Sequence, residues 1–81
     1  ETVQEVQARV AERIAELRKQ AGLTQQQVAE RAGMQPSNYQ RIEYGGQNLT
    51  IETLVKIAQA IGVSVNEFWT RKRGKSAPPP S

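Results

Sequence analysis

The residues best suited to recognition chemistry lie between positions 35 and 44, where amide, hydroxyl and guanidinium side chains occur close together. Successive residues of an α-helix rotate by about 100°. If Tyr39 and Ile42 point inward, the opposite face of a helix over 36–44 carries hydrogen-bonding side chains and no acid: Ser37, Gln40, Arg41 and Tyr44. Such a short helix is typical of elements that read base edges in the major groove of DNA.

The absence of cysteine and histidine narrows the possible chemistry. It excludes disulfides, thiolate nucleophiles, Cys/His zinc sites and catalysis based on histidine. The carboxylates are scattered and form no acid–base constellation. We therefore expect no enzyme, no cofactor and no metal, and nothing in the sequence indicates a small-molecule ligand.

The positive charge of the chain is concentrated at one end. Of the 81 residues, 11 are Lys or Arg and 8 are Asp or Glu, but four of the basic residues lie within 71–75. Residues 1–70 therefore keep seven basic and eight acidic side chains, a net charge of −1. The basicity belongs to a Pro-rich tail over 71–81, which we expect to be flexible, and it does not by itself indicate a binding face on the body.

Hydrophobic periodicity and capping residues predict five helices and no strand. Thr24 and Gln27, for example, have the spacing of a capping box, and Pro36 suits the first position of a helix. The expected helices span about 3–21, 24–32, 36–44, 51–61 and 65–70. The predicted fold is all-α, a compact five-helix bundle over residues 1–70. Because no apolar run has the length of a membrane span and no signal peptide opens the chain, a cytoplasmic protein is expected.

The two short helices around Gly33-Met34-Gln35 have the form of a helix-turn-helix. Other short motifs extend the pattern along the chain: Gly22-Leu23-Thr24-Gln25, Val28-Ala29, Ile42-Glu43, Thr53-Leu54 and Ile61-Gly62-Val63. Together, over about residues 10–69, they resemble the lambda-repressor-like (Cro/repressor, XRE) helix-turn-helix family. The resemblance implies a double-stranded DNA partner.

The resemblance also implies roles for individual side chains. Combined with the helical geometry, it gives two predicted groups. The predicted base contacts are Gln35, Pro36, Ser37, Asn38, Gln40 and Arg41. The predicted contacts to the DNA backbone are Thr24, Gln25, Tyr44, Gln47, Asn48 and Arg18. Pro36 has no N–H and no polar side chain, so its contact would be apolar, for example to a thymine methyl group.

Other residues are expected to serve the structure. Arg18 and Glu43 occupy positions that pair in the resembling family, which implies a salt bridge between them. Tyr39 is expected in the core. Three apolar residues of the last helix are candidates either for the core or for a partly exposed dimer patch: Val65, Phe68 and Trp69.

The favoured interpretation is a sequence-specific transcriptional regulator that binds a pseudo-palindromic operator as a homodimer. The stretch from Asn48 to Ile51, with the short last helix, looks similar to the controller proteins of restriction–modification systems, and the size also suits phage repressors and antitoxins. One alternative is a helix-turn-helix module that binds a protein, such as a toxin. Another is the N-terminal DNA-binding part of a longer, ligand-sensing regulator.

Overall fold

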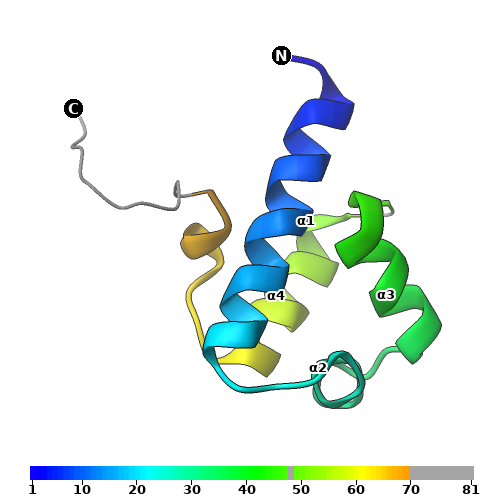
Figure 1. Cartoon of the computed structure of the whole chain (residues 1–81), viewed down its shortest axis with the longest axis vertical. Helices are drawn as coiled ribbons and strands as arrows, with labels where there is room; N and C mark the ends of the chain where they lie inside the picture. Colours follow the sequence, from blue (N-terminus) through cyan, green and yellow to red (C-terminus); the bar gives the residue numbers. More distant parts are fainter. Residues whose placement is uncertain (48, 70–81) are drawn as a thin grey trace.

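Four α-helices and one 3-10 helix make up the part of the chain that the computed structural model describes, residues 1–47 and 49–69 (Figure 1). They are α1 (Val3–Gln20), α2 (Gln25–Ala32), α3 (Pro36–Gly45), α4 (Ile51–Ile61) and the 3-10 helix η1 (Val65–Trp69). No strand occurs in these residues. Within the same residues, no helix is both long and apolar enough to cross a bilayer.

Threonine side chains fix where three of the helices begin. Thr24 and Gln27 form the predicted capping box, in which the Thr24 hydroxyl accepts from the Gln27 N–H at 3.0 Å and the Gln27 side chain accepts from the Thr24 N–H at 2.9 Å. Thr2 and Thr50 cap α1 and α4. These bonds satisfy backbone donors that a helix leaves unpaired at its start. Helix α3 begins at Pro36 without a side-chain cap from Gln35.

The helices enclose one core. Its most completely buried large side chains come from all four α-helices and η1: Tyr39, Phe68, Ile14, Ile57 and Val28. Helix α1 packs against α3 and η1, while α2 packs against α4 and α3. Figure 1 shows α1 upright in the centre, α3 beside it on the right, α2 at the base and α4 behind α1. Helix α3 is thereby packed against both α1 and α2.

Two features of the predicted fold need correction. The described residues contain four α-helices and a 3-10 helix, not five helices of one kind, because residues 65–69 make only a short turn that begins with an i+3 bond from the Glu67 N–H to the Ser64 carbonyl. The first and third helices also end one residue away from the predicted positions, at Gln20 and Gly45. The end of the last predicted helix at residue 70 and the tail over 71–81 lie outside the described residues.

Candidate nucleic-acid interface

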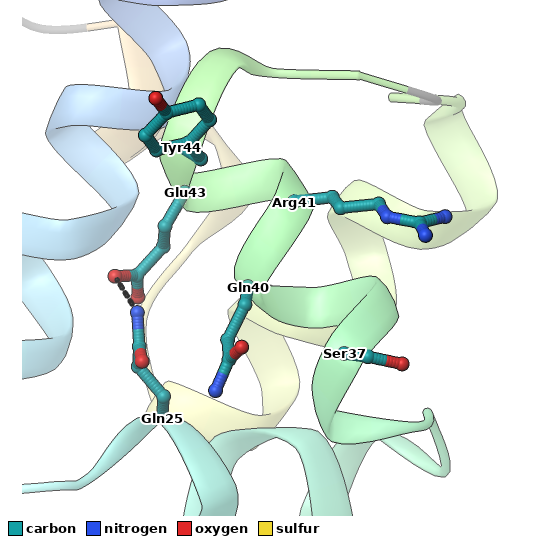
Figure 2. Close-up of a pocket in the computed structure, with 6 residues that line it drawn as sticks. All are labelled: Gln25, Ser37, Gln40, Arg41, Glu43 and Tyr44. Carbon is teal, nitrogen blue, oxygen red and sulfur yellow. Dashed lines mark hydrogen bonds between the residues drawn. The ribbon is translucent and has the colours of Figure 1, made fainter.

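Helix α3 has one buried face and one polar, exposed face, as predicted. Tyr39 is fully buried and Ile42 is 2% exposed. The opposite face holds four exposed side chains: Ser37, Gln40, Arg41 and Tyr44. In Figure 2 the side chains of Ser37 and Arg41 project to the same side of α3, while Gln40 points toward α2. The exposed face therefore offers hydroxyl, amide and guanidinium groups with no carboxylate among them.

The start of α3 presents further polar groups beside this face. Gln35 and Asn38 are exposed, and Pro36 is half-buried. Gln35 has an extended backbone (φ −67°, ψ 136°) and its side chain makes no capping bond. Its amide is therefore available to a ligand in front of the helix.

A hollow of about 640 Å³ joins α3 to the start of α2. It is lined by the residues drawn in Figure 2: Gln25, Ser37, Gln40, Arg41, Glu43 and Tyr44. Gln25, the first residue of α2, belongs to this lining, and the N-terminus of a helix favours anions such as phosphate. Thr24 is exposed there and serves as the cap, a role compatible with a phosphate contact.

Behind the exposed face, a network of buried hydrogen bonds is centred on Glu43. The Arg18 guanidinium donates to the Glu43 carboxylate from Nε at 2.6 Å and from Nη2 at 3.1 Å. The Gln25 amide donates to the same carboxylate at 2.9 Å, as the dashed line in Figure 2 shows, and the Tyr39 hydroxyl also donates to it. The side chains of Arg18 and Glu43 are only 11% and 6% exposed. Bidentate pairs of this kind are the strongest that side chains form.

These contacts decide the protonation states at the site. Burial alone would raise the pKa of Glu43, but the hydrogen bonds from Arg18, Tyr39 and Gln25 outweigh it and lower that pKa. The hydrogen bond to Glu43 raises the pKa of Arg18. Burial, reinforced by the bond to Glu43, raises the pKa of the Tyr39 phenol far above its ordinary value. At neutral pH the network therefore holds a carboxylate, a guanidinium and a neutral phenol.

The predicted pair of Arg18 and Glu43 is thus present, and the Arg18 side chain is mostly buried. Its Nη1 donates to the Leu23 carbonyl at 2.8 Å, so all three guanidinium nitrogens are used within the chain. One N–H on each of Nη1 and Nη2 is left over, so the expected contact of Arg18 with DNA phosphate stays a prediction. The sequence analysis also missed the bonds of Gln25 and Tyr39 to Glu43. The i,i+4 spacing of Tyr39 and Glu43 could have indicated one of them.

The remaining predicted residues lie at two other places. Gln47 is exposed after α3, and Asn48 lies outside the described residues. The predicted dimer patch is only partly at the surface: Val65 is half-buried and Trp69 is 54% exposed. Phe68 is 1% exposed and belongs to the core, so its assignment to a dimer patch is wrong. The short 3-10 helix turns the Phe68 side chain inward against α1 and α4, where it covers the end of the core.

Comparison with known families agrees with this geometry. Residues 14–68 match the model of a family described as Helix-turn-helix. An uncharacterized HTH-type transcriptional regulator of Sinorhizobium fredii is 41% identical over 61 residues, which cover 75% of this chain and 79% of the relative. The transcriptional repressor RstR of the cryptic phage CTXphi in Vibrio cholerae is 38% identical over 78% of this chain and 56% of its own length. The chain therefore belongs to this helix-turn-helix family.

Solved structures show the same arrangement of helices. The restriction–modification controller protein C.AhdI from Aeromonas hydrophila superposes with a TM-score of 0.72 and 28% identity, over 75% of this chain and 92% of that one. The wild-type controller protein C.Esp1396I superposes with a TM-score of 0.75 and 28% identity, over 80% and 84% of the two chains.

Proposed function

We propose that this protein is a DNA-binding transcriptional regulator that recognises its operator by inserting α3 into the major groove. The observation that carries the proposal is the exposed face of α3, which combines Ser37, Gln40 and Arg41 without any acid. A helix fits the major groove, where each base pair presents its own pattern of donors and acceptors. The family membership and the names of the relatives, regulators and repressors, support the same function.

The proposed contacts divide into those that specify sequence and those that fix position. The Arg41 guanidinium suits bidentate contact with guanine O6 and N7, and the amides of Gln40 and Asn38 suit adenine. Gln35, Pro36 and Ser37 complete the base-reading group at the start of α3. The residues proposed to hold phosphate are Thr24, Gln25, Tyr44, Gln47 and Asn48. The second N–H of the Gln25 amide can donate to phosphate while the first remains on Glu43.

A single short helix covers only a few base pairs, so we propose that two copies bind together. In helix-turn-helix dimers the recognition helices are one turn of DNA apart, about 34 Å or about 10 base pairs from centre to centre. The operator would accordingly be an inverted repeat with that spacing. A regulator of this kind acts where the chromosome is, and we place it in the cytoplasm.

Selection from a pool of random duplex DNA tests the proposal. The wild-type protein should enrich an inverted repeat, and Arg41→Ala should lose its preference at one base pair of each half-site, weakening binding by about 1–3 kcal/mol per half-site. Lys56→Ala is the matched control, because it removes one positive charge from α4 and leaves α3 unchanged. The control should enrich the same sequence as the wild type.

Failure to enrich any sequence would contradict the proposal. If binding then declined uniformly with rising salt, the interaction would be non-specific attraction to phosphate. The nearly balanced charge of residues 1–70 would in that case favour a protein partner for the same face of α3.

A further inference from the structure

Gln25 and Glu43 belong both to the buried hydrogen-bond network and to the lining of the hollow between α2 and α3. Gln25 is the first residue of α2 and is half-buried, whereas the Glu43 side chain is only 6% exposed. The Gln25 Nε2 donates to Glu43 Oε1 at 2.9 Å, as the dashed line in Figure 2 shows. A buried charge is therefore bonded directly to a side chain that lies on the proposed DNA-binding face.

The Glu43 carboxylate fixes which way the Gln25 amide points. An ionised carboxylate only accepts hydrogen bonds, whereas an amide has an NH2 end that donates and an oxygen that accepts. The NH2 end must therefore face Glu43, because the reverse orientation would bring two acceptor oxygens together. Glu43 is itself held in place, since Arg18 donates to both of its oxygens. One N–H and the oxygen of the Gln25 amide remain for partners in the hollow.

The neighbouring glutamine of α2 is held much less firmly. Gln26 makes a longer bond of 3.4 Å to Glu30, and both side chains are exposed, so water competes for that bond. Ordering a free side chain on binding costs about 2- to 10-fold in affinity. Folding has already ordered Gln25, so a ligand in the hollow avoids this loss.

We propose that Glu43 is a positioning residue for DNA binding, which holds the Gln25 amide so that its outer N–H meets a DNA phosphate. The inference rests on the proposed function and adds a role for a residue that does not itself touch DNA. A phosphate beside Gln25 also lies at the start of α2, where the N-terminus of a helix favours anions. Because Arg18 pairs with Glu43 at 2.6 Å, the buried carboxylate adds little repulsion toward that phosphate.

Loss of the Gln25 amide should weaken DNA binding without changing the preferred sequence. Gln25→Ala is measured on the inverted repeat that the wild type selects and on a duplex of shuffled sequence. We expect a loss of about 5-fold per bound copy on both duplexes, because one neutral hydrogen bond is lost and phosphate contacts carry no sequence information. The slope of log K against log salt concentration should not change, since a neutral amide releases no counterions.

Gln26→Ala is the matched control for this measurement. It removes the same amide from an adjacent, exposed position outside the hollow and should bind DNA as the wild type does. A loss in Gln25→Ala that is confined to the selected repeat would mean that Gln25 reads a base, and would overturn the proposal.

The effect of Gln25 should also depend on Glu43. Glu43→Gln preserves the shape of the side chain, but an amide accepts either end of the Gln25 amide, so its orientation is no longer fixed. In this background Gln25→Ala should cost less than about 2-fold in affinity. In a Tyr39→Phe background, which removes a different hydrogen bond to Glu43, the loss of about 5-fold should persist. An undiminished loss in Glu43→Gln, or a diminished loss in Tyr39→Phe as well, would overturn the proposal.

The wild-type protein supplies a readout that does not depend on the folding of any variant. NMR relaxation of the side-chain amides is measured before DNA is added. The Gln25 amide should be as rigid as the backbone on the picosecond to nanosecond timescale, while the Gln26 amide moves freely. A mobile Gln25 amide would overturn the proposal.

Selection from random DNA separates failure of this inference from failure of the proposed function. If the wild type selects an inverted repeat but Gln25 is mobile or uncoupled from Glu43, only the positioning role is lost. If the wild type selects no sequence, the proposed function itself fails.

Discussion

The Glu43 carboxylate accepts hydrogen bonds from side chains on three helices: Arg18 of α1, Gln25 of α2 and Tyr39 of α3. A buried carboxylate is stable only when its charge is paired and its oxygens are hydrogen-bonded. Each of these partners therefore restricts where α3 can lie. The exposed face of α3 depends on this network for its orientation, although Glu43 itself need not contact DNA.

Glu43→Gln should destabilise the fold by about 3 kcal/mol at neutral pH, because it leaves the nearly buried Arg18 guanidinium without a charged partner. Urea unfolding measures the effect. Glu12→Gln is the control, since Glu12 is exposed on α1 and its replacement should change the free energy of unfolding by less than about 0.5 kcal/mol.

The difference between wild type and Glu43→Gln should also depend on pH. The pKa of Glu43 is lowered in the folded state, so the wild type binds fewer protons when folded than when unfolded. Its extra stability is present above about pH 4.3, the ordinary pKa of glutamate, and is lost as the pH falls through the lowered folded pKa. A difference that stayed constant from pH 7 to pH 2 would contradict the assignment of a charged Glu43.

At the scale of elements, the C-terminal end of α3 lies directly against α1. Gly46 is the C-cap of α3 and has a left-handed backbone with φ +73°. A Cβ built on it would lie 2.4 Å from the carbonyl oxygen of Gln7 in α1. The position therefore requires glycine for two reasons: its backbone conformation and the space left by the neighbouring helix.

Gly46→Ala should consequently cost about 3 kcal/mol, combining left-handed strain with displacement of the α1 backbone. Gly22→Ala separates the two causes. Gly22 has a similar φ of +75°, but a Cβ at this position would meet nothing within 4 Å, so only the strain of about 1–2 kcal/mol remains. Thermal unfolding of the two variants measures the difference. Equal losses would show that the contact with Gln7 does not limit the packing of α1 on α3.

At the scale of the whole molecule, charge and recognition are located in different places. Residues 1–70 carry a net charge of −1, and the four remaining basic residues lie within 71–75. The exposed face of α3 contributes Arg41 as its charged group. We therefore propose that α3 supplies the sequence preference and that the charges of residues 71–75 supply a large share of the long-range attraction to DNA.

Truncation after Thr70 should therefore reduce the dependence of DNA binding on salt concentration. The preferred DNA sequence should change little. Each phosphate neutralised contributes about 0.9 to the slope of log K against log salt concentration, so four contacts would account for about 3.6. Binding isotherms between low and moderate salt measure the slope for the full and truncated chains. An unchanged slope would show that these four charges do not touch DNA.

The sequence by itself determined the helices and the direction in which α3 faces. Capping threonines, glycines after helices and the spacing of apolar residues depend on contacts within a few positions. These local rules placed the starts of α3 and α4. The same periodicity put Tyr39 and Ile42 inside. The pairing of Arg18 with Glu43 was implied by the resemblance to a family rather than by spacing.

Only the tertiary structure decided what depends on residues far apart in the chain. It placed Gln25 beside Glu43, used every guanidinium nitrogen of Arg18 internally, and turned Phe68 into the core while Trp69 stayed at the surface. Phe68 and Trp69 are adjacent and both aromatic, so their residue types do not predict which of the two side chains is buried. The two side chains differ in exposure because α1 and α4 cover one side of the short 3-10 helix and leave the other side open.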